Sequence, residues 1–252
     1  MKAIVDDSCK WLHDQLSRLR VFCFPLEIRC LPNNAIYFLY EKGEVWGHGG
    51  AVPRIVRIGT HKDGNFKSRI AEHYLLDESK MNFDRNRPAP HERSIFRKNI
   101  GRALLNSRKD PYLQVWEIDF TSKACREKSG HLRDVQTEKR IEEEVTQLIR
   151  EKFSFRFIEI ENQSQRMGRH GLESRLIGTV AGCRRCWPSG GWLGSHSPKQ
   201  QIRESGLRLV HHLQAEPISE EERDTVAQAV RKQAQAPVSR PPENAVEGMP
   251  IA

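Results

Sequence analysis

The sequence predicts an α+β fold in which a small antiparallel β-sheet is flanked by helices. Residues 35–41 (AIYFLYE) and 54–59 (RIVRIG) alternate in polarity and are rich in β-branched and aromatic side chains, so we expect them to pair as antiparallel strands. Residues 135–153 place apolar side chains on one helical face and charges elsewhere. Strands and helices then follow in an order that fits one small sheet with helices packed against it.

A core domain is predicted over residues 33–213, and it contains this hairpin. The other elements are assigned from the spacing of apolar residues, which differs between helices and strands. In chain order they are helices 67–76 and 94–105, a strand at 112–120, the helix 135–153, a strand at 155–160, and helices 172–182 and 199–213.

Additions are expected at both ends of this domain. Residues 1–32 show a helical pattern followed by an extended segment broken by prolines. Residues 214–236 are expected to form a C-terminal helix. Residues 237–252 are rich in proline and poor in large apolar side chains, so they are expected to be a disordered tail.

Composition favours a chain that folds around a core and has no membrane segment. Of its 252 residues, 37% are hydrophobic, and no run reaches the roughly 18 apolar residues that a membrane helix needs. Acidic residues stand where a secretory signal would be apolar, so we expect a cytoplasmic location. The net charge of +8 suits either an anionic partner such as DNA or good solubility.

Six cysteines are scattered along the chain rather than arranged as a dense disulfide framework, so reduced thiols are expected. Cys183 and Cys186, in the segment CRRC, form half of a structural zinc motif that His196 or a distant cysteine would have to complete. A single CxxC in a loop is a weak signal, and two reduced thiols or a redox-sensitive pair are favoured over zinc.

The stretch around the hairpin gathers side chains suited to phosphate chemistry. Strand alternation places Tyr37 on the opposite face from Phe38, while Arg69 and His73 project from one face of the following helix, toward the hairpin. A guanidinium can bind phosphate oxygens, and a phenol or imidazole can take a proton from water. Phosphodiester hydrolysis commonly needs a divalent cation, and Glu173, at the start of an otherwise apolar helix, is the candidate metal ligand.

Each candidate also has an ordinary structural interpretation. Tyr37 fits a strand aromatic, and Arg69 with His73 fits a solvated helix face. Glu173 fits an acid favoured by the helix dipole. The joint occurrence of these residues in order is what favours a nuclease site.

Other charged residues are weaker candidates. His61 and His91 could each contact phosphate, although surface histidines are common. The basic segments RKNIGR (97–102) and RESGLRL (203–209) fit either a path for DNA or solvated helix faces.

The candidate residues and the blocks between them resemble the GIY-YIG nuclease family. AIY at 35–37 stands for the GIY element, and RIG at 57–59 stands for YIG. Further blocks resemble a bacterial branch of the family in the same order: RIGTH, SRIAEH, SIFRKNIGRAL, GLESRLIGTVA and WLGSHSPKQQIRESGL. The resemblance covers roughly residues 33–213, and it depends on the ordered blocks rather than on one short motif.

The resemblance implies a DNA endonuclease that hydrolyses phosphodiester bonds with one Mg²⁺ or Mn²⁺ ion. It implies that Tyr37 activates water or orients the base, and that Arg69 stabilises the transition state. His73 would assist proton transfer or contact phosphate, and Glu173 would bind the metal. One site cuts one strand, so double-strand cleavage would require a homodimer or sequential nicking.

Three departures from the family pattern leave a second function open. Arg57 stands where YIG has its tyrosine, so that role would pass to a neighbour such as His61 or be lost. Ala35 replaces the first glycine, and Gly190 and Gly191 stand where many members have an asparagine before the WLG block. The alternative is a catalytically weak or inactive DNA-binding or interaction module of the same fold, for example in phage defence.

Overall fold

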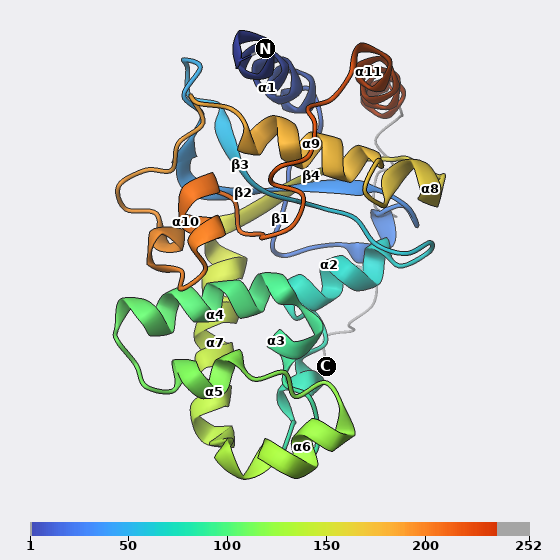
Figure 1. The fold of residues 1–252 in the computed structure, drawn as a ribbon. Helices are drawn as coiled ribbons and strands as arrows, with labels where there is room; N and C mark the ends of the chain where they lie inside the picture. The colour runs from blue at the N-terminus through green and yellow to red at the C-terminus, as the bar shows by residue number, and fades with distance from the viewer. Residues whose placement is uncertain (1, 236–252) are drawn as a thin grey trace, which may run out of the picture.

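The computed structural model describes residues 2–235 and shows one sheet with helices on both faces (Figure 1). The strands are β1 (Phe22–Cys23), β2 (Ile36–Val45), β3 (Pro53–Gly59) and β4 (Phe153–Ile158). Neighbouring strands are antiparallel, in the order β1-β4-β2-β3. The predicted α+β fold with a small antiparallel sheet is confirmed.

The longer helices form two layers around the sheet. One layer holds α1 (Lys2–Ser17), α9 (Leu172–Ala181) and α11 (Glu220–Gln235), and the other holds α2 (Phe66–Tyr74), α4 (Ile95–Ser107) and α7 (Val135–Lys152) (Figure 1). The shorter helices are α3 (Pro90–Arg93), α5 (Leu113–Glu117), α6 (Lys123–Ser129), α8 (Gln163–Arg166) and α10 (Gln200–Ser205). The 3-10 turns are η1 (Ile28–Cys30), η2 (Glu78–Met81), η3 (Gly130–Leu132) and η4 (Leu193–His196).

Alternation along β2 divides the interior into two cores, as predicted. Ile36, Phe38 and Tyr40 pack with apolar residues of α1, α9 and α11, whereas Tyr37 and Leu39 pack with those of α2, α4 and α7. Each fully buried side chain of this size contributes about 1.5–3 kcal/mol, so both helical layers are held by the sheet. Tyr37 therefore lies on the face that α2 and α4 cover.

An irregularity in β3 places two consecutive side chains, Val56 and Arg57, on that same face. Leu39 pairs with Arg57 while Tyr40 pairs with Ile55, so Val56 is an extra residue in β3. Bulges of this kind direct consecutive side chains to one side of a strand. The Arg57 guanidinium consequently lies 5.7 Å from the centroid of a core ring on α4, that of Phe96.

Two predicted elements are wrong. The strand predicted at 112–120 is absent, and the short helix α5 (Leu113–Glu117) lies there instead. The helix places Trp116 over Gly101 of α4, where its Nε1 donates to the Lys98 carbonyl at 3.1 Å. The helix predicted at 199–213 ends at Ser205, where Gly206 takes a left-handed conformation with φ of 66°. The chain then runs along the sheet, and the Arg208 amide donates to a carbonyl of β3.

The other predicted helices and strands are present, with ends that differ by a few residues. At the termini, α1 shares the core of the sheet, and α11 contacts α1 and β4. The division at residues 32, 213 and 236 stays a prediction, and the predicted tail at 237–252 lies outside the described residues. Within residues 2–235, every helix falls short of the length or the apolar character that crossing a membrane requires.

The basic side chains of the RKNIGR segment are buried in ion pairs rather than free to contact DNA. Arg97 pairs with Glu142 at 2.6 Å, and Lys98 and Arg102 pair with acidic residues of neighbouring elements. Arg208, in the RESGLRL segment, likewise pairs with a glutamate of β2 at 2.8 Å. These four side chains are therefore unavailable to DNA, because a buried charge needs its partner inside the fold. Arg203 of the RESGLRL segment is exposed, and a contact with DNA there stays a prediction.

His91 belongs to the same buried network and lies neither at the surface nor in a position to meet phosphate. Its Nδ1 is 2.8 Å from Glu142 Oε1, its Nε2 is 2.9 Å from Glu92 Oε1, and its ring stacks on Trp116. Burial alone would lower the pKa of His91. Hydrogen bonds and charges from the two glutamates outweigh burial and raise this pKa above its ordinary 6.5.

Replacing His91 with Gln tests this network. The folded state binds the His91 proton more tightly than the unfolded chain, so protonated His91 stabilises the fold. This stabilisation is fully present below pH 6.5 and is lost as pH rises through the raised pKa. Denaturant titrations at several pH values should show a wild-type advantage over His91→Gln that shrinks with increasing pH. Replacing the exposed His196 with Gln should give no such trend, and an advantage that grows with pH would contradict the assignment.

Candidate active site

Tyr37 lies directly across the β2–β3 pair from Gly59, and its ring covers that glycine. A Cβ at position 59 would stand 2.4 Å from the Tyr37 hydroxyl oxygen and 2.5 Å from Cζ. Any side chain there would displace the phenol, so the glycine of the RIG segment is required by contact. The tyrosine of the AIY segment and the glycine of the RIG segment thus form one unit.

The Tyr37 hydroxyl is hydrogen-bonded to His73 of α2, with 2.9 Å between the oxygen and Nε2. The other ring nitrogen, Nδ1, is 2.8 Å from the Ser94 hydroxyl, which caps the start of α4. A neutral imidazole has one N–H, so one nitrogen donates and the other accepts. With the proton on Nδ1 and directed at Ser94, Nε2 is free to accept the proton of the phenol.

The electrostatic surroundings keep both groups neutral near neutral pH. Burial raises the pKa of Tyr37, while the charges of Arg57 and Arg69 oppose that rise and the charge of Glu173 adds to it. Burial lowers the pKa of His73 well below 6.5, and nearby guanidiniums, including Arg57 and Arg69, lower it further. The phenol therefore keeps its proton, and the imidazole is available as an acceptor.

Glu173, the second residue of α9, reaches the end of β3. Its Oε1 accepts a hydrogen bond from the backbone N–H of Thr60 at 3.0 Å, and Thr60 follows the glycine that Tyr37 covers. Burial raises the pKa of Glu173, and the charge of Arg57 and the Thr60 N–H partly offset this rise. Over residues 2–235, Glu173 forms no ion pair. A partly buried carboxylate without a cationic partner is suited to bind a cation.

Arg57, which the sequence marked only as a departure from the family pattern, takes a central position in the structure. Its Nη1 donates to the Arg208 carbonyl at 2.6 Å, and its Nε is buried without a hydrogen-bond partner in the described part of the chain. Its charge acts on Tyr37, His73 and Glu173. The family tyrosine is thus replaced by a cation at the centre of the group. The sequence signal was a charge two residues before Gly59, on the same side of β3 as that glycine.

Arg69 lies at the solvent side of this group. Its side chain is 36% exposed, and Nη1 donates to Glu72 Oε2 at 3.1 Å and to the Arg93 carbonyl at 3.0 Å. As predicted, it projects from the same face of α2 as His73, since its charge acts on that ring. Arg69 is therefore placed to meet a ligand that approaches Tyr37 from solvent.

His61 differs from the other candidates because the backbone engages both of its ring nitrogens. Nε2 accepts from the Ala35 N–H at 3.1 Å, and Nδ1 donates to the Lys62 carbonyl at 2.6 Å. Burial lowers the pKa of His61, which favours this neutral ring. Through these two hydrogen bonds, His61 holds the start of β2 against the loop after β3. Neither nitrogen is free to take a proton from water.

The structure therefore brings Tyr37, His73 and Glu173 together around Arg57, with Arg69 at the rim. A sequence model of the GIY-YIG domain matches residues 12–236, which is most of the chain. The chain belongs to the GIY-YIG family. No curated protein and no solved structure matches it significantly. Members of the GIY-YIG family are generally nucleases, so membership indicates a nuclease-type function and hydrolysis of phosphodiester bonds in DNA.

A Gly59→Ala substitution tests the contact between Tyr37 and Gly59. The added methyl group overlaps the phenol, so we expect a loss of about 1–3 kcal/mol in the free energy of unfolding, together with disruption of the Tyr37–His73 hydrogen bond. Denaturant titration measures the first effect. Gly190→Ala is the matched control, because a Cβ at 190 has no atom within 4 Å. Equal stability of the two variants would show that Tyr37 does not cover Gly59.

Proposed function

We propose that this GIY-YIG protein is a metal-dependent DNA endonuclease that hydrolyses phosphodiester bonds by attack of an activated water. The observation that carries the proposal is the hydrogen bond between the Tyr37 hydroxyl and His73. Nearby lies the Glu173 carboxylate, which forms no ion pair within residues 2–235. A phenol, an imidazole, cations and a carboxylate within electrostatic reach of one another are the groups that phosphodiester hydrolysis requires.

Glu173 would hold the metal ion, either Mg²⁺ or Mn²⁺. Thr60 occupies only Oε1, and Oε2 accepts no hydrogen bond from the described residues. Magnesium is commonly bound by one or two carboxylates, with water and substrate phosphate oxygens as the remaining ligands, and this donor set fits one glutamate. When bound, the ion supplies positive charge against the negative charge that develops on the phosphate.

Tyr37 and His73 move the proton of the attacking water. The phenol oxygen takes that proton while its own proton passes to Nε2 of His73, so no free phenolate is formed. The resulting hydroxide forms the new bond to phosphorus as the bond to the leaving sugar oxygen breaks. That oxygen takes a proton from solvent water, and the proton held by His73 is released to solvent after the reaction. Nearby guanidiniums disfavour imidazolium, but the phosphate anion offsets their charge, which makes the transfer dependent on bound substrate.

Arg57 and Arg69 are assigned to the phosphate. Arg57 has an unpaired buried Nε beside Tyr37, and Arg69 carries its charge at the solvent edge. Guanidiniums bind phosphate oxygens through paired N–H groups and stabilise charge that grows in the transition state. The described part of the chain contains one such group of residues, so we expect nicking of one strand. Double-strand cleavage would require a second chain or sequential nicking.

A binding module without strong catalysis is the second candidate. It is favoured by the burial of Tyr37, which is only 1% exposed, because a water must reach the phenol for the reaction to proceed. Such a module would bind DNA with a salt-dependent affinity and cut none.

Nicking of supercoiled plasmid with Mg²⁺ or Mn²⁺ decides between the two. We expect Tyr37→Phe, Glu173→Gln and Arg57→Ala each to lower the rate by about 10²-fold or more, because each removes a group that acts in the transition state. Addition of a chelator should abolish wild-type nicking.

The matched control is Tyr40→Phe, which removes a buried hydroxyl from the same strand on the opposite face, where it has no hydrogen-bond partner within the described residues. It should cut at the wild-type rate. Nicking by Tyr37→Phe and Glu173→Gln at the wild-type rate would refute the site. A wild-type protein that binds plasmid and never nicks it would establish the binding module.

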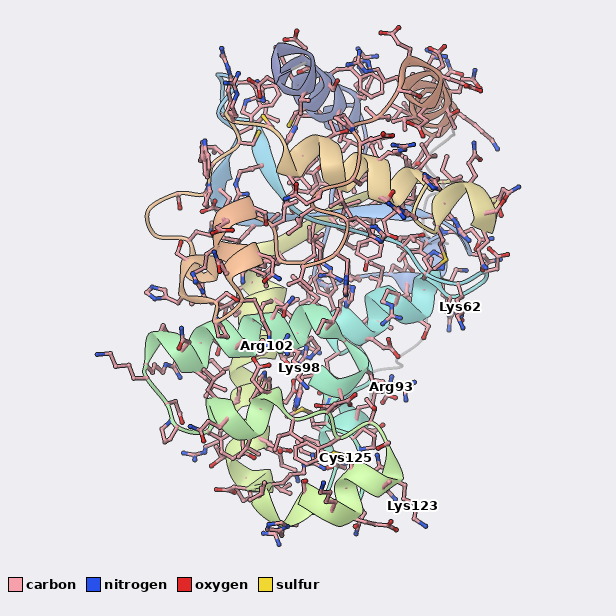
Figure 2. All side chains as sticks on the ribbon, viewed as in Figure 1. Lys62, Arg93, Lys98, Arg102, Lys123 and Cys125 are labelled. Atoms are coloured by element: carbon pink, nitrogen blue, oxygen red, sulfur yellow. The ribbon has the colours of Figure 1, made fainter. Side chains whose placement is uncertain are left out.

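Exposed cations before the start of α2 and at the end of α3 are assigned to the DNA backbone. Lys62 and Arg93 are both exposed, whereas Lys123 lies on α6, away from them (Figure 2). We expect a Lys62→Ala, Arg93→Ala double variant to bind duplex DNA more weakly and to lower the salt dependence of binding by about one to two counterions. Lys123→Ala, which removes a side chain that is 85% exposed, should change neither quantity. Identical salt slopes for both variants would place the DNA elsewhere.

A further inference from the structure

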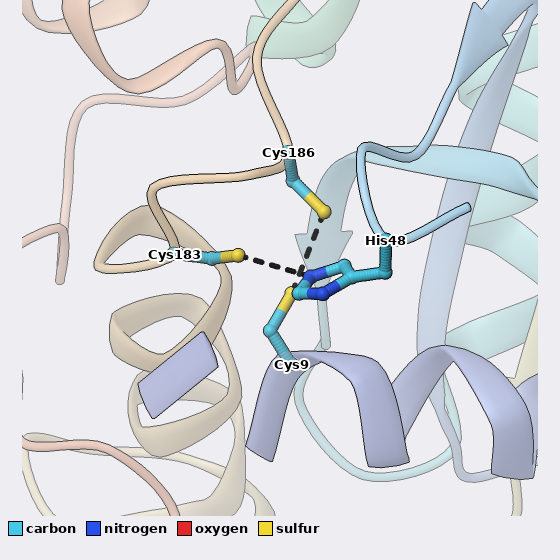
Figure 3. A group of neighbouring side chains, drawn as sticks. All are labelled: Cys9, His48, Cys183 and Cys186. Atoms are coloured by element: carbon cyan, nitrogen blue, oxygen red, sulfur yellow. Dashed lines mark hydrogen bonds between the residues drawn. The ribbon is translucent and has the colours of Figure 1, made fainter. Parts of the chain in front are cut away.

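Three cysteines and one histidine from distant parts of the chain meet at the opposite end of α9 from Glu173. Cys9 comes from α1, His48 from the loop between β2 and β3, and Cys183 and Cys186 from the loop after α9 (Figure 3). One potential ligand atom from each residue lies within 4.8 Å of all the others. Figure 3 shows the three thiols and the imidazole pointing toward one another.

We propose that Cys9, His48, Cys183 and Cys186 bind one structural zinc ion. The sequence supplied only the CxxC half of this group, and His196, one of the residues considered to complete it, is exposed and lies outside the group. Sequence alone could not identify Cys9 and His48 as partners of the CRRC pair. Cys9 lies 39 positions before His48, and His48 lies 135 positions before Cys183, so only the fold brings these residues together.

Two distances between ligand atoms lie close to the edges of a tetrahedron around one ion. Zinc bonds of about 2.3 Å to sulfur and about 2.05 Å to nitrogen give edges of about 3.8 Å between two sulfurs and about 3.6 Å between sulfur and nitrogen. Cys9 Sγ lies 3.6 Å from Cys186 Sγ, and His48 Nε2 lies 3.2 Å from Cys183 Sγ. A disulfide would need about 2.05 Å between the sulfurs, so these cysteines are not in the geometry of a disulfide bond.

The surroundings of the group support ligation by thiolates. All three cysteines are buried, and three buried thiolates need a cation to balance their charge. The Arg185 N–H donates to Cys183 Sγ at 3.5 Å, as backbone amides do toward metal-bound sulfur. A Cβ on Gly47 would stand 1.6 Å from the Arg185 carbonyl oxygen, so the loop that carries His48 is pressed against the CRRC loop.

The ligand types indicate zinc, and the absence of a coordination position for water indicates a structural role. Three sulfurs and one nitrogen select a soft or borderline ion, unlike the oxygen ligands that magnesium requires. Four protein ligands leave no position for water, which is the pattern of structural sites. The ten residues of α9 span about 15 Å, so this ion is separate from the metal proposed at Glu173. It would tie α1 and the β2–β3 loop to the end of α9.

Metal analysis of the full chain, purified under reducing conditions without a chelator or a metal-binding tag, tests the proposal. We expect about one zinc per chain in the wild type and in Cys23→Ser, Cys30→Ser and Cys125→Ser, whose thiols lie outside the group. His48→Ala, which removes the only partly exposed ligand, should bind zinc at least tenfold more weakly and melt at a lower temperature.

Replacement of zinc by Co²⁺ keeps the test informative if cysteine variants fail to fold. The wild type should show the visible bands of tetrahedral Co²⁺ and the near-ultraviolet charge-transfer bands of thiolate ligands, and His48→Cys should keep both with shifted positions. A wild type that neither retains zinc nor develops these bands would overturn the proposal. Stoichiometric iron or copper in place of zinc, or a disulfide among Cys9, Cys183 and Cys186 in the freshly reduced protein, would overturn it as well.

Discussion

The hydrogen bond between the Glu173 carboxylate and the Thr60 N–H is the contact on which the site depends. It joins the start of α9 to the end of β3, across 113 positions of sequence, and it sets the carboxylate beside the glycine that Tyr37 covers. The sheet holds Tyr37 and Gly59 in register, and α2 adds His73 from the same face. The proposed metal ligand, proton acceptor and cation could act on one phosphate only if this contact holds.

Much of the fold could be predicted because its periodicities are strong. The alternation of β2 correctly assigned Tyr37 and Phe38 to opposite cores, and the apolar stripe of α7 was clear from its sequence. The strand predicted at 112–120 failed because alternation of apolar residues over a short segment also fits one turn of helix, and packing of Trp116 on α4 decides between them. Gly206 ended α10 early through its left-handed conformation.

The site was predictable in its residue types and less so in their roles. The resemblance identified Tyr37, His73 and Glu173, and the structure places them together. Periodicity could not show that the Arg57 side chain is buried where its charge acts on Tyr37, nor that the backbone engages both nitrogens of His61. Contacts made through bulges, caps and loops depend on tertiary geometry, and local patterns in a single sequence do not reveal that geometry. The same limit hid Cys9 and His48 as partners of the CRRC pair.

Anomalous diffraction from Mn²⁺ tests the central claim most directly, in crystals of the protein with a DNA whose scissile phosphate resists hydrolysis. We predict one manganese peak bonded to a Glu173 oxygen and to a phosphate oxygen, with Tyr37 and Arg57 facing that phosphate. Data collected below the zinc absorption edge separate this peak from any zinc at Cys9. A manganese peak away from Glu173, or DNA bound on a face remote from Tyr37, would contradict the account.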